Sequence, residues 1–150
     1  MNSDFSVAVH AMVYLSHSGC TLSSEALAQN ICTNPARVRK VMSKLAKAGC
    51  ISTKEGLEGG YQLARPAAEI TLAQVSRALE VKFVNTGWKS GDPAKACLIA
   101  SGMADVLDSL YAHLDEICKQ RLAEITVGTI EERIFAVHPG GIPSCAPQPK

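Results

Sequence analysis

The sequence predicts a mainly α-helical protein with one small β-hairpin, followed by a single long helix. Apolar residues recur at helical spacing through most of the chain. Two short β-prone runs flank a glycine-rich tip near the middle, and an apolar stripe continues along residues 103–125. With 150 residues, of which 47% are hydrophobic and 19% charged, the chain is long enough for one small domain and an appendage.

Two helices are expected before the basic part of the chain. The first covers residues 4–17, where Ser3 can provide the N-cap and Ser18 precedes a helix-ending glycine. The second begins near Ser23 or Ser24. Each has an apolar face at helical spacing, formed by Phe5, Val9, Met12 and Val13 in the first and by Leu27, Ala28 and Ile31 in the second.

A basic third helix is expected at residues 35–48. Asn34 can cap it, Pro35 suits its first position and Gly49 ends it. Residues 34–54 contain six basic residues and no acidic one. One face is apolar, and the other face and its flanks carry Arg37, Arg39, Lys40, Ser43, Lys44 and Lys47. A cationic face of this kind is the electrostatic footprint of phosphate binding.

A hairpin follows, with strands at residues 50–54 and 60–64 joined by a flexible tip. Thr71 then caps a fourth helix. A short helix, a basic helix and a hairpin in this order form a winged helix-turn-helix, which predicts binding to double-stranded DNA. The residues expected to contact DNA are Ser24, Asn34, Arg37, Arg39, Lys40, Ser43, Lys44, Lys54, Gly59, Gly60 and Tyr61.

The predicted DNA-binding domain covers residues 1–82, and residues 83–100 form a loop and the start of the long helix. Residues 101–135 form that helix and a short last helix capped by Thr126, and residues 136–150 are expected to be a disordered tail. The apolar stripe is broader than one small domain can cover, which favours a homodimer over packing within one core. The expected dimer interface is Met103, Leu107, Leu110, Leu114 and Ile117.

Several classes of function are not expected. No apolar run is long enough to cross a bilayer and no secretion signal is present, which favours the cytoplasm. The six cysteines include no CxxC pair, so no metal site is expected. The sequence shows no nucleophile–base pair and no phosphate-binding loop, so an enzyme is not expected. A winged-helix module that binds proteins and not DNA is the alternative from another class.

Two motifs resemble a known family. Residues 59–66, with the sequence GGYQLARP, and the following EITL at residues 69–72 resemble the wing and next helix of the Rrf2 family of bacterial regulators, which includes IscR-like and NsrR-like sensors. The resemblance covers about residues 3–135. It implies a homodimer of winged-helix lobes that binds a pseudo-palindromic promoter site, usually as a repressor.

The best-known members of that family hold an iron–sulfur cluster on three cysteines before the long helix. Here only Cys97 lies between residues 80 and 102, so no cofactor is expected. This pattern resembles the single-cysteine subgroup, which implies a sensor of oxidants or electrophiles such as quinones. A regulator that senses through an iron–sulfur cluster or a small molecule remains the alternative.

Cys97 lies near the start of the long helix, where free N–H groups stabilise a thiolate, and Lys95 and Lys89 are nearby. Its modification is expected to act at the hinge between lobe and dimer helix. The alternative is a cysteine that only fills a gap in the core. Packing is the expected role of the other cysteines before the tail, which are Cys20, Cys32, Cys50 and Cys118.

Overall fold

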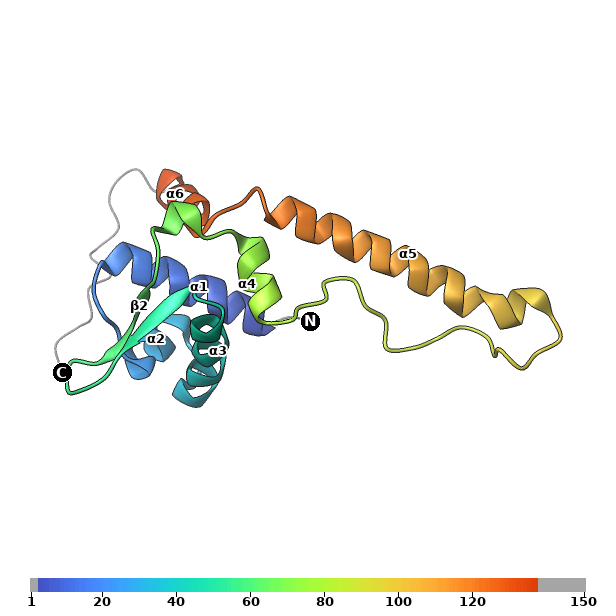
Figure 1. The fold of residues 1–150 in the computed structure, drawn as a ribbon, viewed down its shortest axis with the longest axis horizontal. Helices are drawn as coiled ribbons and strands as arrows, with labels where there is room; N and C mark the ends of the chain where they lie inside the picture. The colour runs from blue at the N-terminus through green and yellow to red at the C-terminus, as the bar shows by residue number, and fades with distance from the viewer. Residues whose placement is uncertain (1–2, 138–150) are drawn as a thin grey trace.

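The computed structural model describes residues 3–137, which form a globular body and a long arm (Figure 1). The predicted tail, apart from its first two residues, lies outside this range, as does Cys145. The elements are α1 (Ser3–Ser18), α2 (Ser24–Ile31), α3 (Pro35–Lys47), β1 (Ile51–Lys54), β2 (Gly60–Leu63), the 3₁₀ turn η1 (Ala67–Glu69), α4 (Leu72–Ala78), α5 (Leu98–Leu122) and α6 (Val127–Ala136).

Helix α1 forms the centre of the body and contacts α2, α3, α4 and α6. Ala8, Ala11 and Met12 on this helix are fully buried, and the two alanines let neighbouring helices approach closely. The face of α3 that packs against it is the apolar face predicted from the sequence, which consists of Val38, Val41, Met42 and Leu45. The mainly helical fold class with a small hairpin is therefore confirmed.

Most helix starts are where their capping residues predicted them. Asn34 accepts a hydrogen bond from the Arg37 N–H at 3.0 Å, and Thr71 and Thr126 each begin a helix with a reciprocal capping box. The prediction for Ser3 is wrong, because Ser3 is already the first residue of α1. Its hydroxyl instead accepts a hydrogen bond from the Arg37 side chain.

The hairpin pairs Ile51 with Leu63 and Lys54 with Gly60 in an antiparallel register. Its second strand is tied to the segment before α2 by two hydrogen bonds between Leu22 and Tyr61, of 3.0 and 2.8 Å. Gly60 allows this approach, since a Cβ atom there would lie 2.3 Å from the Leu22 carbonyl oxygen. The wing is thus held at a fixed position beside α2.

The arm consists of a loop that runs outward from α4 and of α5, which runs back to the body (Figure 1). The 25 residues of α5 span about 37 Å. The loop is tied to the helix by the Lys89–Asp108 ion pair at 2.7 Å, by the Asp92 N–H to the Ala100 carbonyl at 2.9 Å, and by Asp115. These contacts make loop and helix one unit.

After the arm, α6 packs against α1 and η1. The chain is held there by hydrogen bonds from the Leu72 N–H to the Ile125 carbonyl and from the Val127 N–H to the Ile70 carbonyl, of 2.8 and 2.9 Å. Residues 101–135, which the sequence analysis places in one group, are therefore divided: α5 belongs to the arm and α6 to the body. The base of the arm is anchored on both sides, by α4 before it and α6 after it.

Candidate nucleic-acid interface and sensor arm

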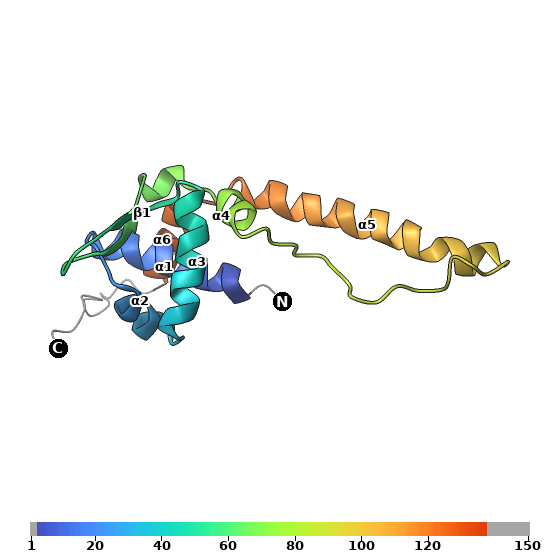
Figure 2. The same ribbon diagram turned by 60° about the horizontal axis from the view of Figure 1, so that its bottom comes forward.

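The outward surface of α3 lies between α2 and the hairpin, and Figure 2 brings this helix to the front of the body. Lys40 and Ser43 are exposed there, as the sequence predicts. Lys47 is exposed on the same face and was left out of the predicted contact set, although its helical position already indicated it. These three side chains form an uncovered polar and cationic strip opposite the buried face of the helix.

Arg37 and Lys44 lie on the flank of α3 that faces α1 and α4. The Arg37 guanidinium donates to Asp4 Oδ1 from Nε at 2.9 Å and from Nη2 at 2.8 Å. Lys44 is half-buried and lines a hollow with Asp4 and Glu80. The expectation that Lys44 belongs to the outward face needs correction, because the start of α1 and the end of α4 partly cover that flank. Arg37 joins α1 to α3.

Arg39 lies on the opposite flank, towards α2 and the wing. Its Nη1 donates to Ser24 Oγ and to Glu25 Oε1, both at 3.1 Å. Ser24 is only 7% exposed, and its hydroxyl also donates to Glu25 Oε2 at 3.1 Å. Ser24 therefore supports Arg39 and has little surface left for a direct DNA contact. Glu25 was not among the site residues predicted from the sequence. The one indication in the sequence was its acidic side chain in the first turn of α2.

The remaining predicted contacts have different surroundings. Lys54 is exposed at the end of β1, while the Asn34 side chain is occupied as a helix cap. Gly59 and Gly60 have a structural reason for being glycine, since a Cβ on Gly59 would lie 2.4 Å from the Lys54 carbonyl oxygen. Tyr61 is half-buried, and burial raises the pKa of its phenol, with Arg39 lowering it and Glu25 raising it. Arg39, Glu25 and Tyr61 are thus electrostatic neighbours.

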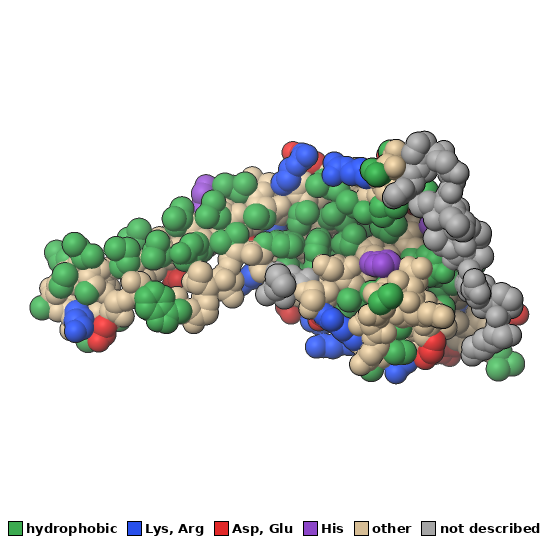
Figure 3. Space-filling view, turned by 180° about the vertical axis from the view of Figure 1, so that it is seen from behind, with side chains coloured by type: hydrophobic (Ala, Val, Ile, Leu, Met, Phe, Trp, Pro, Cys, Tyr) green, Lys and Arg blue, Asp and Glu red, His purple; other side chains and the backbone are tan. Residues whose placement is uncertain are grey.

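Helix α5 leaves its apolar stripe largely uncovered in a single chain. Leu110, Leu114 and Ile117 are 48%, 40% and 47% exposed, Met103 is exposed, and Leu107 is half-buried. In Figure 3, hydrophobic side chains run along the whole arm and continue onto the body. The stripe begins earlier along α5 than predicted, because Leu98 and Ile99 are also exposed. An apolar surface of this length marks an interaction site.

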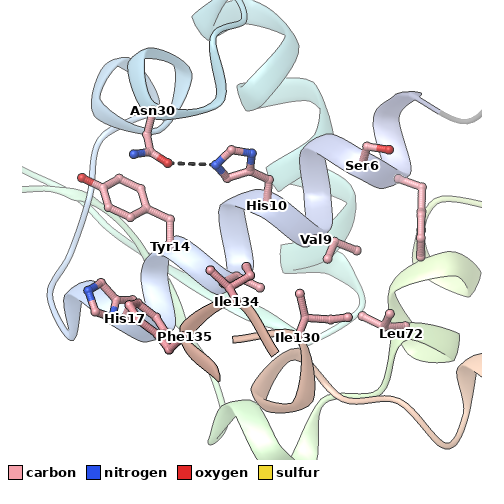
Figure 4. A pocket seen from close by; sticks show the side chains of 12 residues that line it. Ser6, Val9, His10, Tyr14, His17, Asn30, Leu72, Ile130, Ile134 and Phe135 are labelled. Carbon is pink, nitrogen blue, oxygen red and sulfur yellow. Dashed lines mark hydrogen bonds between the residues drawn. The ribbon is translucent and has the colours of Figure 1, made fainter. Parts of the chain in front are cut away.

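The body carries an apolar groove of about 530 Å³ between α1 and α6, which was not predicted from the sequence. Val9, Ile130 and Ile134 point into it, with Phe135 at one end (Figure 4). His10 Nε2 and Asn30 Oδ1 form a 2.8 Å hydrogen bond at its edge. Nothing in the local sequence places α6 against α1, so the groove is a product of the tertiary fold.

Cys97 is exposed and is the N-cap residue of α5. The backbone N–H groups of Ala100 and Ile99 lower the pKa of its thiol, although neither is aligned well enough for a full capping hydrogen bond. Neither Lys95 nor Lys89 contributes to the lowered pKa of Cys97. Lys89 pairs with Asp108. The lowered pKa thus comes from the helix end.

The position of Cys97 differs from the expected hinge. Residues 83–97 run outward before α5 turns back, so Cys97 lies at the far end of the arm from its own body (Figure 1). Two of the other cysteines, Cys20 and Cys32, also differ from expectation. Cys50 is buried as predicted, and burial raises the pKa of its thiol, whereas Cys20 and Cys32 are exposed.

The donor set around Cys97 does not fit an iron–sulfur cluster within one chain. Over residues 3–137, no three His, Cys, Asp or Glu side chains are grouped as metal ligands. His113 and Cys118, the nearest candidates in sequence, lie about 24 and 31 Å along α5 from Cys97 by helical rise. A cluster needs several thiolate or imidazole ligands around one centre, which this arm does not bring together.

Comparison with known proteins finds relatives along most of the chain. The model of the Rrf2 family, described as an iron-dependent transcriptional regulator, matches residues 1–133. YwnA of Bacillus subtilis, named as a candidate HTH-type transcriptional regulator, is 27% identical over 135 residues, or 90% of this chain and 99% of YwnA.

Solved structures share the fold. That of a candidate transcriptional regulator from Lactobacillus plantarum has a TM-score of 0.76 at 28% identity and covers 93% of each chain. CymR, the global cysteine regulator of B. subtilis, has a TM-score of 0.64 at 18% identity over 89% of this chain and 96% of its own. No helix within residues 3–137 is long and apolar enough to cross a membrane.

Proposed function

This chain belongs to the Rrf2 family of transcriptional regulators, and we propose that it is a homodimeric repressor that senses oxidants or electrophiles through Cys97. The family and its relatives are regulators and not enzymes. The observation that carries the proposal is the exposed cationic strip of α3, held between α2 and a hairpin whose position is fixed by Leu22 and Tyr61. The protein acts in the cytoplasm, on promoter DNA.

In the proposed complex, α3 enters the major groove with its buried face towards α1. Lys40 and Lys47 reach phosphates on either side, and Ser43 faces the base edges between them. Lys54, at the end of β1, contacts the backbone beside the adjacent minor groove. Lysine contacts to phosphate provide affinity without sequence information, so base recognition has to come from other side chains.

The homodimer is supported by two apolar surfaces that residues 3–137 of one chain leave uncovered. The stripe on α5 is the first, and the groove between α1 and α6 is the second. Two arms packed along their stripes place each arm tip, with Leu98 and Ile99, near the other copy. Such a dimer presents two recognition helices to two half-sites one helical turn apart, about 34–36 Å.

The sensing step begins with the Cys97 thiolate. It attacks hydrogen peroxide, the O–O bond breaks, and a sulfenic acid and hydroxide result; alternatively, it adds to a ring carbon of a quinone, which takes up one proton from water and becomes a hydroquinone bonded to the Cys97 sulfur as a thioether. Because the tip lies far from its own body, the added group alters contacts with the other copy. A change in the spacing of the two recognition helices then releases the DNA.

We also propose that this sensing needs no iron–sulfur cluster. The single cysteine at the arm tip and the distances to His113 and Cys118 support this. The chemistry would then be that of a thiol with a lowered pKa.

The test is fluorescence anisotropy of the purified protein with duplex DNA from its own upstream region, first in excess thiol and then with peroxide or a quinone. Tight, salt-sensitive binding that is lost on oxidation, and is retained by Cys97→Ser, is the expected result. DNA affinity that does not change with peroxide or quinone would contradict the sensor role of Cys97 and would leave the DNA-binding role standing. Binding with no salt dependence would instead favour a protein-interaction module.

A further inference from the structure

An acidic residue lies beside the cationic strip of α3, where a phosphate backbone would repel it. Glu25 opens α2, and its side chain is 65% exposed. Its own backbone N–H, then the Ser24 hydroxyl and Arg39, lower the pKa of its carboxyl. Glu25 is therefore charged at neutral pH, and its presence on this surface needs a reason other than general attraction to DNA.

Glu25, Ser24 and Arg39 form a closed polar ring. Arg39 Nη1 donates to Glu25 Oε1 and Ser24 Oγ, and the same hydroxyl donates to Glu25 Oε2, with all three distances 3.1 Å. Ser24 is buried, so one corner of the ring is anchored in the body. An ion pair this exposed contributes little to folding stability. Its main physical effect is to restrict the many rotamers of a long arginine side chain.

The ring uses only one nitrogen of the guanidinium. Arg39 Nε and Nη2 have no hydrogen-bond partner within residues 3–137. These two nitrogens form one edge of the planar group, a fork that matches two acceptors side by side. In the major groove, the O6 and N7 atoms of guanine present such a pair, which makes arginine to guanine the commonest specific contact.

The ring lies beside the wing, in a position suited to a contact between Arg39 and a base edge. Ser23, Ser24 and Glu25 border a polar hollow of about 370 Å³ with wing residues that include Lys54 and Gly60. Arg39 also interacts electrostatically with Tyr61 on β2. The guanidinium thus stands where α2, α3 and the wing converge, on the flank of the recognition helix nearest the wing.

We propose that Glu25 is a positioning residue that holds Arg39 so that its free edge reads a guanine in the operator. This rests on the DNA-binding function proposed above. Arg39 provides the base contact, and Glu25 provides the fixed orientation that makes the contact selective. A flexible arginine could equally reach a phosphate, which carries no sequence information.

The experiment starts from a duplex selected by the wild-type protein out of a random library, followed by a panel with each base pair changed in turn. Arg39→Ala is expected to lose about fivefold to 150-fold of discrimination at one G·C pair. Glu25→Gln, which removes the charge and keeps the shape, is expected to lose discrimination at that same pair. In the double variant the two losses should not add.

Glu58→Gln is the matched control, because Glu58 is an exposed wing-tip residue with no ion pair among the described residues. It loses the same charge and should raise affinity for every duplex alike. If Glu25→Gln behaves in that way and keeps its discrimination, the positioning role is wrong. Unchanged melting temperatures show that folding is not the cause. A wild type that selects no duplex would overturn the DNA-binding function itself.

Discussion

Arg37 and Arg39 lie two positions apart on α3 and serve different neighbours. A rotation of about 200° between them turns one towards α1 and the other towards α2. Arg37 makes two hydrogen bonds to Asp4, which join the first helix to the third. Arg39 has one edge with no hydrogen-bond partner in the described part of the chain. Around the helix axis, Lys40 lies between the two arginines, and its side chain is exposed.

Lys40→Ala should weaken binding to all DNA sequences alike. One lost phosphate contact lowers the slope of log affinity against log salt by about 1, because one fewer counterion is released. Anisotropy titrations at several salt concentrations measure this. Lys95→Ala is the control, since Lys95 is exposed near the arm tip and away from α3. An unchanged slope for Lys40→Ala would mean that the proposed orientation of α3 is wrong.

Cys97 should react with iodoacetamide faster than an unstructured cysteine peptide at pH 7. Its folded pKa lies below the usual thiol value, so the reactive thiolate is already present at lower pH. Cys50 should react last, because burial both shields it and raises its pKa. Mass-spectrometric mapping across pH 5–9 measures each site. A Cys97 that reacts no faster than the peptide contradicts its role as sensor.

Among the elements, the start of the loop is held to α5 by Asp115, in the second half of that helix. This residue is 6% exposed, and its Oδ1 accepts hydrogen bonds from the Phe83 N–H at 2.6 Å and the Val84 N–H at 3.1 Å. Lys119 Nζ lies 2.7 Å from Oδ2 and, with the two N–H groups, holds the pKa of Asp115 below its usual value despite burial. One carboxylate thus joins the outgoing loop to the returning helix.

Asp115→Asn should loosen the start of the loop and leave the body folded. An amide accepts hydrogen bonds less strongly than a carboxylate, so exchange of the Phe83 and Val84 amide hydrogens should speed up about tenfold, on the order of 1.4 kcal/mol. Hydrogen exchange measured by NMR tests this. Lys119→Gln is the comparison, since it keeps both accepted bonds and should have a smaller effect. Equal effects would assign the stabilisation to the ion pair alone.

The same carboxylate gives the arm a defined pH dependence. Because the folded pKa of Asp115 is lowered, its contribution to stability is present above the unfolded value of about 3.9 and is lost as pH falls through the folded value. Exchange at Phe83 and Val84 should therefore be constant, after correction for the intrinsic rate, from neutral pH down to about 4. It should rise only below that.

In the whole molecule, the arm exposes an apolar surface that the proposed homodimer would bury. One chain cannot bury a helix that projects about 37 Å from its body. The contacts of the loop cover one side of α5, and the exposed stripe lies on another. Cys97 and the cationic strip of α3 lie at opposite ends of the molecule, so the proposed sensing mechanism requires a second copy to connect them.

Leu110→Glu should convert the protein to a monomer. A charge in the middle of an apolar interface costs several kcal/mol, which exceeds what the remaining stripe can offset. Light scattering should then report the 15.9 kDa of one chain and not twice that mass, and DNA affinity should fall by more than a hundredfold. Ala112→Glu adds the same charge at an exposed position on the other side of α5 and should remain a dimer. A monomeric wild type would refute the dimer.

Local sequence signals predicted the order of the elements and most of their starts. Caps such as Asn34, Thr71 and Thr126 act within three residues of their partners, and the apolar face of α3 repeats within one turn. Signals of such short range can be read along the chain. They were enough to predict the winged fold, the exposed Lys40 and the long apolar helix.

Tertiary structure alone decided which neighbours each functional side chain has. Arg37 forms an ion pair with Asp4, which is 33 positions away in the sequence, and Arg39 forms one with Glu25, which is 14 positions away. The groove is lined by residues of α1 and α6. The direction of the loop places Cys97 at the arm tip and not at a hinge. Contacts between distant segments depend on how whole helices pack. Periodicity and capping describe one helix at a time and carry no information about that packing.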